Sequence, residues 1–197
     1  MDTGRKERFL ALLEPVYPRL LRYALAMTHD REQARDLVSE AVLVALERFD
    51  FDREESGFPG FLYRIVARKY KKWHRRDLRF AAVDKSTLEA ILDTNAMPDV
   101  AAEISIVMLA LERLPAKMKE TILLFDIGDL SLEEIRAIQG GTLSGVKSRL
   151  RRGREMLKKI LGIDPEEDKS KKTNADPLGN VAGTHKIFME AIENYAL

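Results

Sequence analysis

Residues 130–159 read LSLEEIRAIQGGTLSGVKSRLRRGREMLKK and predict two helices joined by a tight turn. Ser131 is placed to cap the first of them, a short helix. Gly140 and Gly141 supply the turn, and Ser144 is of a residue type that starts helices and so begins the second one. A short helix, a glycine turn and a longer helix make a helix-turn-helix pattern, although a buried pair of helices produces the same pattern.

The second of these helices is strongly basic. Residues 141–161 carry 7 basic and 1 acidic side chains, a net charge of +6. Val146, Leu150 and Leu157 follow the helical repeat and are expected to pack inward. The side chains left over are candidates for contacts with DNA bases and phosphates, because a helix in the major groove presents its first turns to base edges. These candidates are Ser144, Lys147, Ser148, Arg149, Arg151, Arg152 and Arg154.

Helical periodicity covers most of the remaining chain, and no strand pattern of useful length appears. The expected helices cover residues 9–25 with a break at Pro15 or Pro18, and then residues 30–49, 57–79, 100–114, 116–127, 131–138 and 143–161. The fold class is therefore expected to be all-α.

The simplest interpretation is two small helical domains joined by a flexible linker. Residues 81–100 lose the helical pattern and contain Pro98, and the chain after Gly162 is polar and acidic. The expected boundaries are residues 1–80 for the first domain, 81–100 for the linker, 101–161 for the helix-turn-helix domain and 162–197 for a largely disordered tail.

A second basic block lies in the first domain. Residues 61–80 carry 8 basic and 1 acidic side chains, a net charge of +7. The basic residues follow one helical stripe, and Tyr63, Tyr70 and Trp73 interleave with them. Cations that follow a phosphate backbone, beside rings that stack on bases, suit single-stranded or opening nucleic acid. A solvated helix face beside core aromatics gives the same pattern. The candidate residues are Arg64, Arg68, Tyr70, Lys71, Lys72, Trp73, Arg75 and Arg76.

Composition argues against several other classes. The chain has no cysteine and 3 isolated histidines, which excludes disulfides and thiolate chemistry and leaves no metal-ligand spacing. No paired carboxylates or nucleophile with a base appear, so no catalytic residue, cofactor or metal site is expected. The longest apolar runs fall short of a membrane span, and the charged N-terminus does not suit a signal peptide. These features predict a cytoplasmic protein that is not an enzyme.

Three stretches, in order, resemble RNA polymerase sigma factors of the small, extracytoplasmic-function type over about residues 8–161. They are DREQARDLVSEAVLVALERF from residue 30, GFPGFLYRIVARKYKKWHRR from residue 57, and LERLPAKMKETILLFDIGDLSLEEIRAIQGGTLSGVKSRLRRGREML from residue 111. The resemblance implies a dissociable subunit that binds core RNA polymerase, recognises the −10 and −35 elements of promoter DNA and assists initial melting. It also implies that catalysis belongs to the core enzyme. Members of the family often have an inhibitory anti-sigma factor as a partner.

The resemblance also assigns residues. It places Asp36, Leu37, Ser39 and Glu40 against the clamp helices of the largest polymerase subunit. The helical repeat independently leaves Asp36, Ser39, Glu40 and Leu43 off the apolar stripe, as an acidic face with one exposed apolar residue. Plain surface helices also carry such faces.

The promoter-reading residues follow from the same comparison. The resemblance maps Lys147, Ser148, Arg151 and Arg152 to the helix that reads the −35 element. Four departures from the usual family pattern stand out. Ser39 replaces a glutamine and Arg136 an alanine, Ser144-Gly145 replaces Gly-Thr, and Arg68 and Lys72 replace an asparagine and an aspartate in the −10 helix.

Two other functions fit part of the sequence. A stand-alone helix-turn-helix regulator would use the second basic helix, but it leaves the aromatic and basic stripe of residues 61–80 unexplained. Saturable binding to core RNA polymerase discriminates the sigma factor from this regulator. A helical interaction module or an enzyme would use its basic faces to bind acidic partners, but the catalytic version is disfavoured because no catalytic constellation appears.

Overall fold

The computed structural model describes residues 3–50, 55–80 and 106–162, with the side chains of residues 4–50, 55–74 and 106–162. Every regular element in these ranges is helical, which confirms the all-α prediction. The chain divides into two compact units, Met1–Ala90 and Ile91–Leu197. The predicted linker and the predicted tail beyond Gly162 lie outside the described residues.

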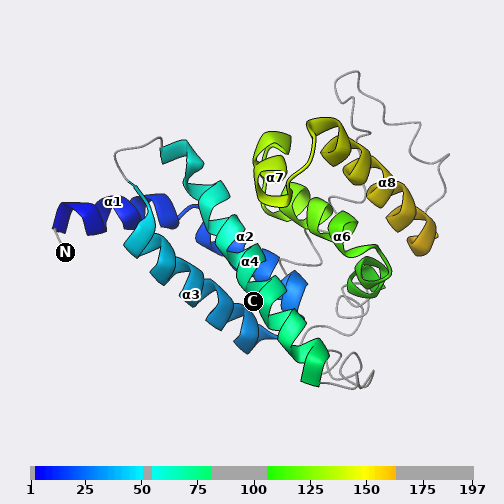
Figure 1. The fold of residues 1–197 in the computed structure, drawn as a ribbon, viewed down its shortest axis with the longest axis horizontal. Coiled ribbons are helices and arrows are strands. Elements are labelled where there is room, and N and C mark those ends of the chain that lie inside the picture. Colours follow the sequence, from blue (N-terminus) through cyan, green and yellow to red (C-terminus); the bar gives the residue numbers. More distant parts are fainter. Residues whose placement is uncertain (1–2, 51–54, 81–105, 163–197) are drawn as a thin grey trace. The chain divides into compact units, whose positions relative to one another are not determined.

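Unit 1 is a set of helices around one core. In chain order they are α1 (Thr3–Leu13), α2 (Tyr17–Thr28), α3 (Arg31–Arg48), the short 3₁₀ turn η1 (Glu55–Gly57) and α4 (Phe58–Phe80). Helix α3 packs against both α2 and α4, and α2 also contacts α4 (Figure 1). The predicted break between the first two helices is confirmed, with Pro18 in the first turn of α2, where its missing N–H costs no hydrogen bond.

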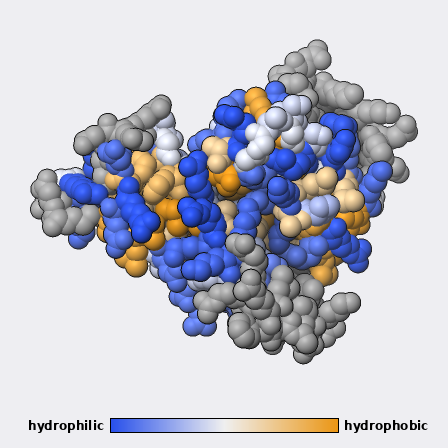
Figure 2. All heavy atoms as spheres, in the orientation of Figure 1, coloured by the Kyte–Doolittle hydropathy of each residue, from blue (hydrophilic) through white to orange (hydrophobic). Residues whose placement is uncertain are grey.

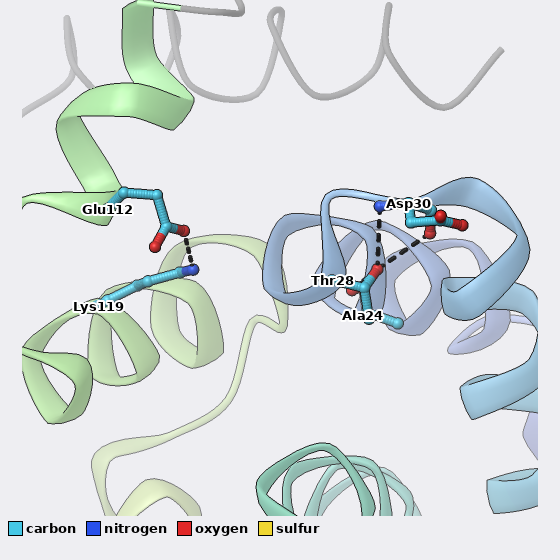
Figure 3. A network of polar contacts seen from close by, with 5 residues as sticks. All are labelled: Ala24, Thr28, Asp30, Glu112 and Lys119. Carbon is cyan, nitrogen blue, oxygen red and sulfur yellow. Dashed lines mark hydrogen bonds and ion pairs between the residues drawn. The ribbon is translucent and has the colours of Figure 1, made fainter. Parts of the chain in front are cut away.

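The corner between α2 and α3 is set by three consecutive residues, Thr28, His29 and Asp30, of which Figure 3 shows the first and the last. His29 adopts a left-handed conformation with φ of 56°, which ends α2. The Thr28 hydroxyl lies 3.0 Å from both the Ala24 and the Asp30 carbonyl oxygens. Asp30 then caps α3 by accepting a hydrogen bond of 2.9 Å from the Gln33 backbone N–H. The predicted helix start at Asp30 is confirmed.

Aromatic side chains fill the core of unit 1 and fix the beginning of α4. Phe58 is fully buried, and its ring meets those of Phe9 and Phe49 edge to face at centroid distances of 5.5 and 4.9 Å. Tyr23 and Tyr63 make a second such pair at 5.2 Å. Tyr63 is fully buried, so the expectation that its ring lies among the basic side chains is wrong.

Unit 2 contains the predicted helix-turn-helix. It consists of a helical segment over residues 106–112, α6 (Ala116–Ile122), the π-helix η4 (Leu123–Ile127), α7 (Leu132–Gln139) and α8 (Leu143–Leu161). Helix α8 packs against α6 and α7 (Figure 1). An ion pair between Glu112 and the buried Lys119 joins the segment 106–112 to α6 (Figure 3).

The single helix expected over residues 116–127 is correct only in part. It is α-helical to Ile122, and then widens into the π-helix. There the Gly128 N–H donates to the Leu123 carbonyl, five residues back, at 3.0 Å. This wider turn contains Phe125 and Asp126, which contact α8 as described below.

The turn between α7 and α8 follows the glycine prediction, but the cap does not. Ser131 and Glu134 form a full capping box at the start of α7. Gly140 and Gly141 have φ of 74° and 88°, a region that other residues rarely adopt. Thr142, and not Ser144, caps α8, because its hydroxyl accepts the Gly145 N–H at 3.1 Å. Ser144 is inside the first turn of the helix.

Candidate nucleic-acid interface

One face of α8 is buried and the opposite face is exposed. Val146, Leu150, Gly153 and Leu157 form the buried face, as their spacing predicted. Ser144, Lys147, Arg151 and Arg152 are exposed and Ser148 is half-buried, all on the other side of the helix. Arg151 also pairs with Glu155 one turn later, at 2.7 Å. We call the side chains of Lys147, Ser148, Arg151 and Arg152 the α8 basic face.

Arg154 does not belong to this face. Its side chain is 10% exposed, and its Nη2 lies 2.5 Å from Oδ1 of Asp126, which is 9% exposed. The guanidinium also lies over the Phe125 ring, 5.1 Å from its centroid. The prediction that Arg154 is available to DNA is therefore wrong. Residue 154 follows Leu150 by four and Val146 by eight positions, which places it on the inward stripe.

Arg149 is also turned toward the protein. Its Nε donates a hydrogen bond of 3.2 Å to Oε1 of Gln139, the last residue of α7. Its Nη2 is buried and has no hydrogen-bond partner among the described residues. The prediction that Arg149 is available to DNA also needs correction, because its guanidinium is held against α7.

The basic stripe of α4 is exposed as far as the structure describes its side chains. Arg64, Arg68, Lys71 and Lys72 are all exposed, while Leu62, Val66 and Ala67 are buried. The aromatic members lie at the edge of this stripe, with Trp73 half-buried and Tyr70 stacked on His74 at a centroid distance of 5.5 Å. The side chains of Arg75 and Arg76 lie outside the described residues.

Lys69 is a charged residue of α4 that the sequence analysis missed. It is half-buried and forms an ion pair with Glu40, across the contact between α4 and α3. Lys69 follows Leu62 by seven and Val66 by three positions, so it lies on the apolar stripe. A charged side chain at such a position requires a partner. The position of Lys69 in the sequence therefore indicates that it forms an ion pair within the protein.

The outer surface of α3 has the predicted character with one exception. Asp36 and Ser39 are exposed, Glu40 is half-buried, and Leu43 is 59% exposed, which is high for a large apolar side chain. Leu37 is fully buried in the core of unit 1, so the expectation that its side chain faces a partner requires correction. We call Asp36, Ser39 and Leu43 the α3 outer surface.

Three further observations concern metal binding, membrane spans and the character of the surface. Within the described ranges, no group of acidic and histidine side chains is arranged to hold a metal ion. No helix described by the structure has the length and apolar character needed to cross a bilayer. The side of the protein drawn in Figure 2 is largely hydrophilic, with apolar side chains in small patches.

Comparison with known proteins identifies both units. Residues 12–80 match the family model for sigma-70 region 2, and residues 104–157 match the model for sigma-70 region 4. The ECF RNA polymerase sigma factor SigD of Mycobacterium tuberculosis is 31% identical over 167 residues, covering 79% of this chain and 78% of that protein. The chain belongs to the ECF family of RNA polymerase sigma factors. Sigma factor YlaC of Bacillus subtilis is 29% identical over 163 residues, covering 80% of this chain and 94% of that protein.

The fold of this sigma factor is also found in a solved structure. The sigma factor RpoE of Bartonella quintana, crystallised with the anti-sigma factor NepR, matches it with a TM-score of 0.65 and 22% identity. The match covers 80% of this chain and 99% of that chain. With regions 2 and 4 both present, the sigma factor binds core RNA polymerase and directs it to specific promoters.

Proposed function

We propose that the sigma factor divides promoter recognition among three surfaces. The α8 basic face reads the −35 element, the exposed stripe of α4 engages the −10 element during melting, and the α3 outer surface binds core polymerase. Catalysis belongs to the core enzyme, the sigma factor works in the cytoplasm, and residues 81–100 link the two recognition domains. The observation that carries the proposal is the division of α8 into two faces. One is buried and is joined to η4 by the Arg154–Asp126 ion pair, and the other is exposed and basic.

The α8 basic face suits a major groove. Its four residues lie within the first three turns of the helix, where a recognition helix meets base edges. Arginine can donate two hydrogen bonds to guanine, and lysine and serine can reach a base or a phosphate. The residues directly before α8, Gly140, Gly141 and Thr142, are all small.

Removal of one arginine from this face should change sequence preference. Arg152→Ala is expected to cost about 1–3 kcal/mol of discrimination at one base pair of the −35 element, the value of one good base contact. The measurement is run-off transcription by the holoenzyme over promoters randomised at this element. Lys159→Ala, at an exposed position in the last turn of the same helix, makes the same charge change and should keep the profile. An equal loss on all sequences would show that Arg152 contacts only phosphate.

The α4 stripe suits a different task. Arg68 and Lys72 are exposed one turn apart and are hydrogen-bond donors only, so they favour phosphates or acceptor-rich base edges. Tyr70 and Trp73 are both partly accessible, and an aromatic ring that stacks on an unpaired base contributes about 1–3 kcal/mol. Such a surface holds an opened strand better than a closed duplex, which supports a role in initial melting.

The α3 outer surface combines an exposed carboxylate with an exposed leucine, a mixture found at protein interfaces. Glu40, which was first assigned to this surface, already pairs with Lys69. Its replacement would therefore disturb unit 1 as well as any interface. Asp36 and Leu43 are the better positions for a test, because both are exposed.

Charge reversal at this surface should weaken core binding. Asp36→Arg with Leu43→Ala is expected to reduce affinity for core polymerase by about tenfold or more, since a like-charge contact and a lost apolar contact add. Competition with unmodified sigma factor for core polymerase measures the effect. Glu7→Arg, at an exposed position of α1, makes the same charge change and should compete normally. Equal competition by the double variant would reject this interface.

An inhibitory partner is also proposed. The related RpoE was crystallised with an anti-sigma factor. This supports the proposal that a protein of the same class binds this sigma factor and keeps it from the polymerase.

A further inference from the structure

Gln139, at the end of α7, joins the three helices of the helix-turn-helix region. We propose that it is a positioning residue that sets the orientation of α8 on the −35 element. The inference rests on the proposed function of the α8 basic face. Gln139 does not lie on that face, and it was not among the candidates drawn from the sequence.

The Gln139 side-chain amide has polar contacts on both its nitrogen and its oxygen. Its Nε2 donates to the Lys117 carbonyl oxygen at 3.2 Å and to Oε2 of Glu120 at 3.0 Å, both on α6. Its Oε1 accepts from Arg149 Nε on α8 at 3.2 Å and lies 2.9 Å from the Thr121 hydroxyl on α6. Both amide hydrogens are therefore used and the oxygen accepts from Arg149, while the single hydrogen of the Thr121 hydroxyl is shared with the Lys117 carbonyl, 2.6 Å away.

These partners permit only one orientation of the amide. The Lys117 carbonyl and the Glu120 carboxylate can only accept, so they must face the nitrogen. Arg149 Nε can only donate, so it must face the oxygen. A flipped amide would place an oxygen against two acceptors and a nitrogen against a donor. The Gln139 side chain therefore fixes the position of Arg149 relative to α6.

Arg149 lies in α8 between the residues of the basic face. The other polar and close-packed fixed points of α8 are farther along the helix. Arg154 pairs with Asp126 of η4, and Gly153 allows α6 so close that a Cβ there would lie 3.0 Å from Ile122 Cδ1. Without the Gln139 contact, only the apolar contacts of Val146 and Leu150 hold the N-terminal turns of α8, and these turns can tilt. Recognition contacts tolerate only about 0.5 Å or 10–20° of displacement, so such a tilt degrades base reading.

The test compares variants in the holoenzyme, by run-off transcription over promoters randomised at the −35 element. Gln139→Met keeps the length of the side chain and removes its hydrogen bonds to Lys117, Glu120 and Arg149. It is expected to reduce the preference for the favoured −35 bases by about tenfold, the discrimination of a single base contact, with core binding unchanged. The same substitution at the exposed Gln33 of α3 is the matched control and should leave the profile unchanged.

A paired exchange separates positioning from stability and covers the case in which Gln139→Met does not fold. Gln139→Glu alone places a second carboxylate beside Glu120 and should flatten the profile. Adding Glu120→Gln restores the net charge and reverses donor and acceptor between the two residues, while Oε atoms at position 139 still accept from Arg149. The double variant removes the contact between two carboxylates but still leaves an acceptor at position 139 facing the Lys117 carbonyl, so it is expected to recover part of the profile.

The outcomes are distinct. A flattened profile in Gln139→Met or Gln139→Glu that returns in part with the paired exchange supports the inference. If Arg152→Ala changes the profile while folded Gln139 variants keep it, or lose activity equally on all sequences, the inference is overturned and the proposed function stands. If none of the variants, Arg152→Ala included, changes the profile, both are overturned.

Discussion

Replacement of Arg154 by alanine is expected to lower the free energy of unfolding of unit 2 by about 3–5 kcal/mol, because it leaves the Asp126 carboxylate buried without its charged partner. The same change removes the cation that lies over the Phe125 ring. Hydrogen exchange of peptides from α6 and α8, followed by mass spectrometry on the full chain, measures this loss for unit 2 alone. Transcription should fall equally for all −35 sequences.

Two variants serve as controls for this result. Arg151→Ala breaks an exposed ion pair one turn away and should cost only about 0.3–0.5 kcal/mol. Arg154→Met combined with Asp126→Leu removes both charges and should recover most of the stability, since an apolar pair often replaces a buried ion pair without loss. If Arg154→Ala costs no more than Arg151→Ala, the ion pair does not hold α8.

Phe58→Ala is expected to destabilise unit 1 by about 3–5 kcal/mol, the usual cost of removing a fully buried phenylalanine. The cavity would lie where the Phe58 ring now meets Phe9 and Phe49, so α1, α3 and α4 would lose a shared contact. The chain has 1 tryptophan, Trp73 in α4, so its fluorescence during urea unfolding reports on unit 1.

The matched control is Leu43→Ala, which shortens an apolar side chain that is 59% exposed. It should change the unfolding free energy by no more than about 0.5 kcal/mol. A comparable loss in the two variants would contradict the assignment of Phe58 to the core and of Leu43 to the surface.

Helical periodicity predicted most of the described helices, and the buried face of α8 in particular. The stripe of Val146, Leu150 and Leu157 was predicted correctly from a period of 3.6 residues. Arg154 was misassigned because it was sorted by charge, although its position is on that stripe. Its partner Asp126 is 28 residues away in the sequence, so only the fold brings the two together.

Features that depend on contacts among several helices could not be predicted from the sequence. Thr142 and Ser144 are both good caps, and the path of the glycine turn decides between them. The role of Gln139 could not be predicted from the sequence, because its partners come from α6 and α8. The domain boundaries and the functional roles of the exposed residues remain predictions.

The π-helix η4 has a consequence for anyone who redesigns this chain. A π turn holds one residue more than the α-helical turn it replaces, and each residue of an α-helix turns the chain by about 100°. Deleting Leu123 or Leu124 would thus restore a regular α-helical turn. It would also rotate the residues that follow the deletion by about 100° and turn Asp126 away from Arg154. In this helix, regular geometry and correct assembly are competing design goals.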